Sequence, residues 1–174
     1  LADRVRVELA AVMYGRKRRE EIGRIFFGIV GDDGKALGAF GLTEAGGGSD
    51  AGATRTTAKL DDGHWVINGS KQFITNSGTD ITTLVTVTAV TGERDGRKEI
   101  SSILVPVPTP GFTAEPAYNK VGWNASDTHP LSFDDVRVPA ENLLGEPGRG
   151  YANFLRILDE GRIAIAALAT GLAQ

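Results

Sequence analysis

The spacing of hydrophobic and polar positions changes twice along the chain. From residue 3 to about residue 27, apolar residues recur at helical intervals and predict one helix. Gly15 and Gly23 lie inside this segment and weaken the prediction, because glycine is a poor helix former. Two glycines and two aspartates at residues 31–34 then indicate a turn.

From residue 36 to about residue 139, short runs rich in β-branched residues alternate with turn residues. The predicted strands are residues 36–43, 54–60, 64–67, 72–75, 81–89, 100–107, 112–116 and 131–138. Asp61-Asp62-Gly63 is typical of a β-hairpin, whereas residues 91–97 predict a polar loop. Because no helix-length segment separates these strands, a mainly β fold is expected, an antiparallel barrel or two orthogonal sheets rather than a parallel Rossmann sheet.

After Gly150 the helical spacing returns, and residues 151–173 predict a second helix with a wide apolar face. A long apolar helix needs partners that cover it. We therefore expect the chain to be part of a larger molecule. The pattern divides it into an N-terminal helical segment (residues 1–35), a β-domain (residues 36–148) and a C-terminal helix (residues 149–174).

The amino-acid composition excludes several kinds of catalytic and metal-binding site. The chain has 174 residues, 41% hydrophobic and 24% charged, which is ordinary for a folded domain. It has no cysteine, which excludes disulfides, thiolate zinc ligands and a thiol nucleophile. His64 and His129 are the two histidines, too few for a histidine-rich metal site.

Charge and hydropathy argue against nucleic-acid and membrane partners. Residues 16–19 are all basic, but Glu20 and Glu21 follow at once and no aromatic residues are interleaved for base stacking. No apolar run approaches the roughly 18 residues that span a bilayer, and the start of the chain has no signal-peptide pattern. We expect a location in a bacterial cytoplasm or an organelle matrix.

The segment that most clearly indicates a binding site is LTEAGGGSD, residues 42–50. Three successive glycines allow backbone N–H groups to converge on an anion, and Ser49 adds a hydroxyl donor. The segment is neither a Walker A loop nor a Rossmann fingerprint, because no Gly-Lys-Ser/Thr follows and a strand comes next. Taken by itself, the segment fits a glycine-rich surface turn better than an anion site.

Four segments taken together are more specific. They are GAFGLTEAGGGSD at residues 38–50, INGSKQFITN at 67–76, SDT at 126–128 and FDDVRVPAENLLG at 133–145. In this order and at these intervals they closely resemble the acyl-CoA dehydrogenase family. The resemblance covers residues 36–174 and does not extend to residues 1–35.

The resemblance implies an α–β–α flavoprotein that holds FAD against its β-domain, with residues 149–174 as the first helix of a truncated C-terminal helical domain. On the family pattern, Phe40, Leu42 and Thr43 line the isoalloxazine ring, and Gly48 and Ser49 meet the pyrophosphate. Phe73 and Ile74 lie beside the flavin, with Phe73 where many members have tryptophan. Thr75 is expected to donate a hydrogen bond near flavin N5.

The same resemblance implies substrate contacts. Ser49 also neighbours the pantetheine of CoA, and Asp159 and Arg162 approach the pantetheine or the substrate carbonyl. Without the family context, Asp159 and Arg162 are equally well a pair of surface charges at i, i+3. Some members carry their catalytic glutamate just before this arginine, but that position is Gly161 here, and Glu160 points about 100° away around the helix.

The implied reaction is α,β-dehydrogenation of an acyl-CoA thioester. The catalytic base is expected beyond residue 174, so these residues alone should lack dehydrogenase activity. The expected partners are an acyl-CoA, an electron-transfer flavoprotein as acceptor and further copies of the chain in a homotetramer. An acyl-CoA oxidase, a related flavin monooxygenase, and a non-catalytic binding or assembly module stay open as alternatives.

Overall fold

The computed structural model describes residues 36–174, except for the side chains of a few residues in the last helix. The helix predicted over residues 3–27 lies outside the described residues. The strands are β1 (Leu37–Gly41), β2 (Thr57–Asp61), β3 (His64–Thr75), β4 (Thr82–Arg94), β5 (Arg97–Pro106), β6 (Phe112–Ala114), β7 (Thr128–Pro139) and β8 (Leu143–Leu144). Two 3-10 turns, η1 (Ala51–Ala53) and η2 (Ala140–Asn142), and one helix, α3 (Gly150–Ala173), complete the described part.

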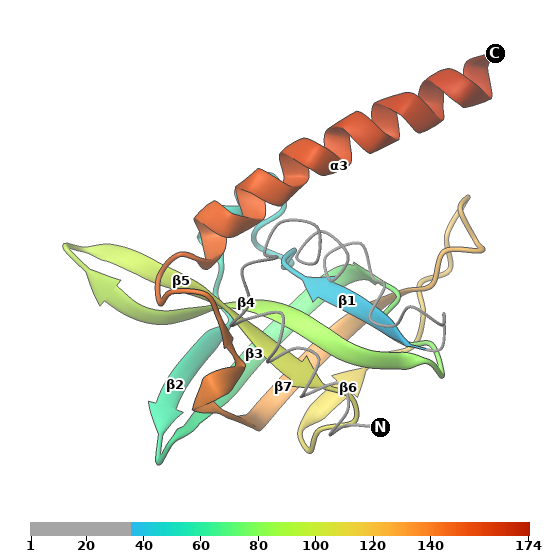
Figure 1. Ribbon diagram of the computed structural model, residues 1–174. Helices are drawn as coiled ribbons and strands as arrows, with labels where there is room; N and C mark the ends of the chain where they lie inside the picture. The colour runs from blue at the N-terminus through green and yellow to red at the C-terminus, as the bar shows by residue number, and fades with distance from the viewer. Residues whose placement is uncertain (1–35) are drawn as a thin grey trace.

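The eight strands form one strongly bent sheet in the order β6-β7-β3-β2-β4-β5-β8, with β1 paired to β4 (Figure 1). The mainly β class and the C-terminal helix are thereby confirmed. In detail the sheet is open and mixed, because β1 runs parallel to β4 over Leu37↔Thr82 to Gly41↔Val87. The segment that follows β1 can thus run directly beside β3, where the Gln72 N–H donates to the Thr43 carbonyl over 2.8 Å.

Alternation along the strands produces one hydrophobic core. Val85, Val87 and Ala89 on β4 and Ile103 and Val105 on β5 are fully buried on one face. From β3 and β7 the core receives Trp65, Ile67, Ile74, Leu131, Phe133, Val136 and Val138. Removing these β-branched and aromatic side chains from water is the main stabilisation of the sheet.

Two expectations about strand ends are wrong. Residues 91–97 are not a loop: β4 continues to Arg94 and β5 begins at Arg97, with Asp95-Gly96 as a two-residue turn. Both turn residues have positive φ (52° and 72°), as at Asp62-Gly63 (46° and 72°). The hairpin end extends beyond the core, so its residues are polar and lack the alternation that marks a buried strand.

The strands predicted at residues 64–67 and 72–75 are one strand, β3, with register shifts between Ile67 and Gly69 and between Lys71 and Ile74. Gly69 allows the first shift, since it has a φ of 146°. A Cβ there would lie 2.6 Å from Thr56 Oγ1. The Asn68-Gly69-Ser70 sequence therefore indicates a bulge rather than a turn.

Helix α3 starts against β5 and then leaves the sheet (Figure 1). The Gly148 N–H donates to Ser101 Oγ over 2.9 Å, and Phe154 stacks on Phe40 of β1 with ring centroids 4.7 Å apart. Beyond this anchor, Ile163 (73%), Ile165 (62%) and Leu172 (76%) are exposed. No helix in the described part of the chain is long and apolar enough to span a membrane.

Gly69→Ala is expected to destabilise the fold by about 2 kcal/mol or more, because the added methyl must displace the Thr56 backbone and a side chain is strained at this φ. Gly161→Ala is the matched control, since a Cβ at Gly161 meets nothing within 4 Å. In a helix this control should be neutral or stabilising by up to about 1 kcal/mol. Urea denaturation of both variants gives the comparison, and equal stabilities would contradict the close approach at Gly69.

Candidate functional site

The glycine loop between β1 and β2 is closed at its base by the carboxylate of Glu44. Glu44 Oε2 accepts the Arg55 N–H over 2.7 Å, and Oε1 accepts the Thr56 N–H (3.1 Å) and hydroxyl (2.7 Å). One side chain thus joins the first residues of the loop to the last. The loop between them needs no core of its own to keep its two ends together.

Lys71 of β3 is fully buried and forms an ion pair with Glu44, Nζ to Oε1 over 2.7 Å. The same ammonium donates to the Leu42 carbonyl and to Thr88 Oγ1, both over 3.2 Å. All three protons of the ammonium therefore have acceptors, two in the segment that follows β1 and one on β4. Such saturation is what makes a buried charge tolerable.

Each charge of the pair counteracts the effect of burial on the pKa of the other. Burial lowers the pKa of Lys71 to about 8, although the Glu44 carboxylate favours the charged form. Burial would raise the pKa of Glu44, but Lys71 and the donors Thr56 and Arg55 outweigh it and lower that pKa below its ordinary value. At neutral pH the pair is an ammonium and a carboxylate.

The ion pair fixes residues 42–44 against the second half of β3. Lys71 holds the Leu42 carbonyl, and the next residue, Gln72, donates its N–H to the Thr43 carbonyl over 2.8 Å. The two segments that the family pattern assigns to the flavin, residues 40–43 and 73–75, are therefore held beside each other by one side-chain and one backbone hydrogen bond.

Phe73 has a backbone conformation that a large side chain rarely adopts. Its φ is 59°, in the left-handed region, and it lies in the second register shift of β3. That conformation costs roughly 1–2 kcal/mol, and it turns the ring outward, where Phe73 is 60% exposed and stacks on Tyr118 at 4.9 Å. A strained residue that presents an exposed aromatic ring points to a binding surface.

The hydroxyls near this strand end divide into two groups. Those of Thr54, Thr56 and Thr128 are engaged in hydrogen bonds within the protein. Within residues 36–174, the hydroxyls of Thr43, Ser49 and Thr75 have no such bond, and Ser49 and Thr75 are exposed. They are donors on a fixed backbone that a ligand could use.

The remaining predicted residues lie close to this region or on α3. Leu42 is half-buried, Ile74 is in the core and Gly48 is exposed, with nothing within 4 Å of a Cβ placed there. Phe40 is half-buried against Phe154. Arg162 is exposed on α3, whereas the side chain of Asp159 lies outside the described part.

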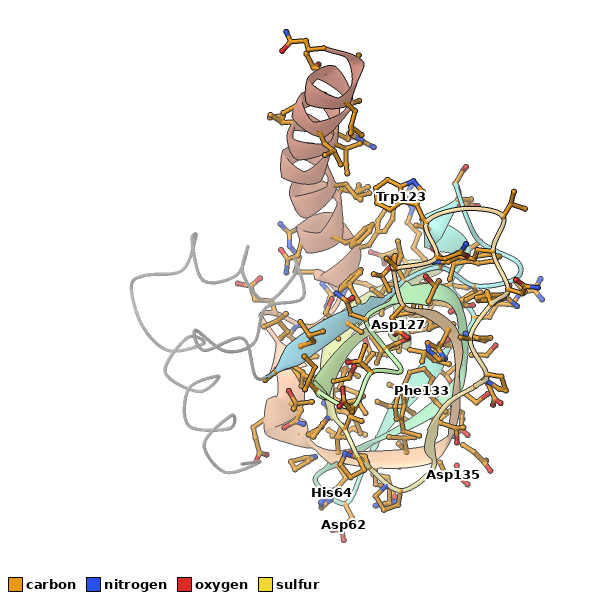
Figure 2. The ribbon with its side chains drawn as sticks, turned by 90° about the vertical axis from the view of Figure 1, so that its right-hand side faces the viewer. Asp62, His64, Trp123, Asp127, Phe133 and Asp135 are labelled. Atoms are coloured by element: carbon orange, nitrogen blue, oxygen red, sulfur yellow. The ribbon has the colours of Figure 1, made fainter. Side chains whose placement is uncertain are left out.

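A second charged pair lies beside the same strand end. Thr75 pairs with Thr128 of β7, and just before Thr128 the Asp127 carboxylate contacts His129, with 2.7 Å between Oδ1 and Nε2. Asp127 lies in the half of the sheet nearer α3, and Asp62 and His64 mark the opposite end (Figure 2). Among the described residues, no group of three or more His, Asp or Glu could hold a metal ion.

Sequence reasoning missed both charged pairs. Glu44, Lys71 and Asp127 lie inside the motif segments, but no local sequence pattern indicates which charged residues form a pair. One available signal is Lys71 itself, a charged residue in a strand of otherwise apolar inward positions. His129 gave no signal beyond its residue type.

Residues 39–136 match the family described as "Acyl-CoA dehydrogenase, middle domain". The chain is 53% identical over 142 residues to the probable acyl-CoA dehydrogenase YngJ of Bacillus subtilis, covering 81% of this chain and 37% of that protein. It therefore spans little more than a third of this curated relative.

Solved structures give the same result. The butyryl-CoA dehydrogenase of Megasphaera elsdenii superposes with a TM-score of 0.72 at 43% identity, covering 78% of this chain and 35% of that one. An acyl-CoA dehydrogenase complexed with FAD from Bacillus anthracis superposes with a TM-score of 0.71 at 36% identity, covering 89% and 25%.

Lys71→Met is expected to destabilise the fold by about 3–5 kcal/mol at neutral pH, because it leaves the Glu44 carboxylate buried without its cation. Without the ammonium, burial raises the Glu44 pKa, so the deficit should shrink as pH falls and Glu44 becomes neutral. The double variant Lys71→Met/Glu44→Gln is the control and should lose less than the single variant. Urea denaturation from pH 4 to pH 8 measures this, and a deficit independent of pH would contradict the ion-pair account.

Proposed function

Because the chain belongs to the acyl-CoA dehydrogenase family, we propose that its β-domain holds FAD and serves the α,β-dehydrogenation of an acyl-CoA thioester. The observation that carries this proposal is the set of three uncommitted hydroxyls, Thr43, Ser49 and Thr75, on a backbone fixed by Lys71 and Glu44. The FAD complex of the Bacillus anthracis relative supports the choice of flavin.

The residues present fit such a group. The glycine loop is exposed at Gly48 and Ser49, and no side chain obstructs the approach of a phosphate to Gly48. Phe73 presents an aromatic surface beside Thr75 on the same strand end. In this proposal the flavin ring is contacted by Phe40, Leu42, Thr43, Phe73 and Thr75, and by the backbone of Ile74, whose side chain lies in the core. Gly48 and Ser49 contact the pyrophosphate.

Bound FAD would supply the redox chemistry by accepting a hydride from the β-carbon of the acyl chain. The contribution of this chain is orientation: Thr75 donates a hydrogen bond at the hydride-accepting side of the ring, and Phe73 excludes water from it. The α-proton must go to a carboxylate. Glu44 does not serve as this base, because its oxygens already accept four hydrogen bonds and its pKa is lowered. In this proposal, the base comes from another part of the protein.

For the substrate, Ser49 and the α3 residues Asp159 and Arg162 are proposed to contact the pantetheine and carbonyl of an acyl-CoA. The Megasphaera relative is named for butyryl-CoA, which makes a short acyl chain the first substrate to test. As electron acceptor we propose an electron-transfer flavoprotein, and as assembly a homo-oligomer that covers the exposed apolar residues of α3. A location in a bacterial cytoplasm or an organelle matrix stays a prediction.

Titration of the purified protein with FAD, followed by quenching of flavin fluorescence, tests the cofactor directly. We expect saturable binding, and Ser49→Ala should raise the dissociation constant about fivefold, since a hydrogen bond to a charged phosphate is worth about 1 kcal/mol or more. Absence of FAD binding would favour the binding or assembly module. Binding that is indifferent to Ser49→Ala would show that the glycine loop does not hold the pyrophosphate.

Thr75→Val is expected to slow flavin reduction by butyryl-CoA in the complete enzyme, because it removes a donor and keeps the shape of the side chain. FAD affinity should change less than the reduction rate. Thr113→Val, at another exposed strand threonine, is the control and should leave both unchanged. Stopped-flow bleaching of the flavin absorbance gives the rate. A reduction rate equal to that of the unmodified enzyme would show that Thr75 has no role in the reaction.

A further inference from the structure

The turn after β3 is held by residues at the start of β7. The Asn76 N–H donates to the Asp127 carbonyl over 3.1 Å, and the Gly78 N–H donates to Asp127 Oδ2 over 2.9 Å. Asp127 therefore contacts the turn through both its main chain and its side chain. The other carboxylate oxygen, Oδ1, lies 2.7 Å from His129 Nε2.

Both ring nitrogens of His129 face groups that only accept hydrogen bonds. Nε2 faces the Asp127 carboxylate, and Nδ1 faces the backbone carbonyl of Glu115. A neutral imidazole has one N–H and one acceptor nitrogen, so it can satisfy only one of these two partners. Both contacts are satisfied together when both ring nitrogens donate, as they do in an imidazolium.

The ring also packs directly on the turn. A Cβ at Gly78 would lie 2.2 Å from His129 Nε2 and 2.4 Å from Cε1, so the imidazole packs closely on Gly78. A displacement of the ring toward Gly78 would therefore have to move the turn. Ile74 pairs with His129 and Thr75 with Thr128, so the turn continues directly from the predicted flavin-binding strand end.

We propose that His129 is a positioning residue that, in its protonated form, fixes the turn of residues 76–78 and with it Thr75. Loss of the proton removes one of the two ring hydrogen bonds and loosens the contact with Gly78. We call the contacts among His129, Asp127 and Gly78 the clamp. Its consequence for flavin binding rests on the proposed function, whereas the clamp itself does not.

Other charged groups near the clamp are already engaged or exposed. The Glu115 carboxylate accepts a hydrogen bond from Ser132 Oγ over 2.8 Å. Lys120 donates to Thr128 Oγ1 over 2.8 Å and to the Ser126 carbonyl, and Asp80, after the turn, is exposed. Asp127 is thus the carboxylate that contacts the ring.

The direction of the pH dependence follows from the contacts. Burial lowers the pKa of His129, but the Glu115 carbonyl and the Asp127 carboxylate outweigh burial and raise that pKa above its ordinary value. The clamp therefore contributes fully below about pH 6.5, the ordinary histidine value, and its contribution is lost as pH rises through the folded-state pKa.

The chain offers a matched control, because its only other histidine, His64, is exposed at the opposite end of β3. NMR titration of the two imidazoles in the unmodified protein needs no variant. We expect one pKa clearly above 6.5, assigned to His129 by its loss in His129→Gln and its retention in His64→Gln. Asp127→Asn should lower it. A His129 pKa at or below the ordinary value of about 6.5 would overturn the proposal.

The functional arm measures the FAD dissociation constant from pH 5.5 to pH 9. The constant should rise about fivefold across the His129 titration, the factor expected for one lost hydrogen bond, in the unmodified protein and in His64→Gln. In His129→Gln this inflection should be absent, whereas a change near pH 8, where the Lys71 ammonium loses its proton, should remain. Binding without this inflection, alongside a raised His129 pKa, would overturn the link to flavin. No FAD binding at any pH would refute the proposed function and leave the imidazole titration as the test of the clamp.

Discussion

The ion pair between Glu44 and Lys71 is the constraint on which the rest of the site depends. Glu44 ties the two ends of the glycine loop together, and Lys71 ties that loop to β3. Because the ammonium is fully buried and satisfied by three acceptors, neither group can move without leaving a charge unpaired. The geometry of the loop is thus determined by a contact 27 residues apart in sequence.

The second half of β3 is held in this way on two sides. Lys71 and Gln72 fix it to the segment after β1, and Asp127 and His129 fix the turn that follows it. Between these supports lie Phe73, in a strained left-handed conformation, and the exposed Thr75. Rigid support on both sides offsets the cost of the strain and keeps an aromatic ring and a hydroxyl facing outward.

Local chemistry explains what the sequence could predict. The alternation of β-branched residues predicts the sheet, Asp62-Gly63 predicts a hairpin, and the apolar face of residues 151–173 predicts α3 within one residue. The motif segments predict the family, which the match over residues 39–136 confirms. The flavin and substrate roles of individual residues stay predictions.

What sequence could not predict depends on pairing between distant segments. The parallel pairing of β1 with β4 and the acceptors of Lys71 are set by the whole sheet, since no short segment contains both partners. The Asp95-Gly96 turn was missed because its flanking residues lie beyond the core and are polar.

The central claim is that Lys71 and Glu44 hold two separate segments in position for one ligand. A crystal structure of the protein with FAD tests it most directly. The account predicts a single flavin dinucleotide whose ring contacts residues 42–43 and 73–75 together and whose pyrophosphate contacts Ser49. A flavin bound elsewhere, or one that reaches only one of the two segments, would contradict it.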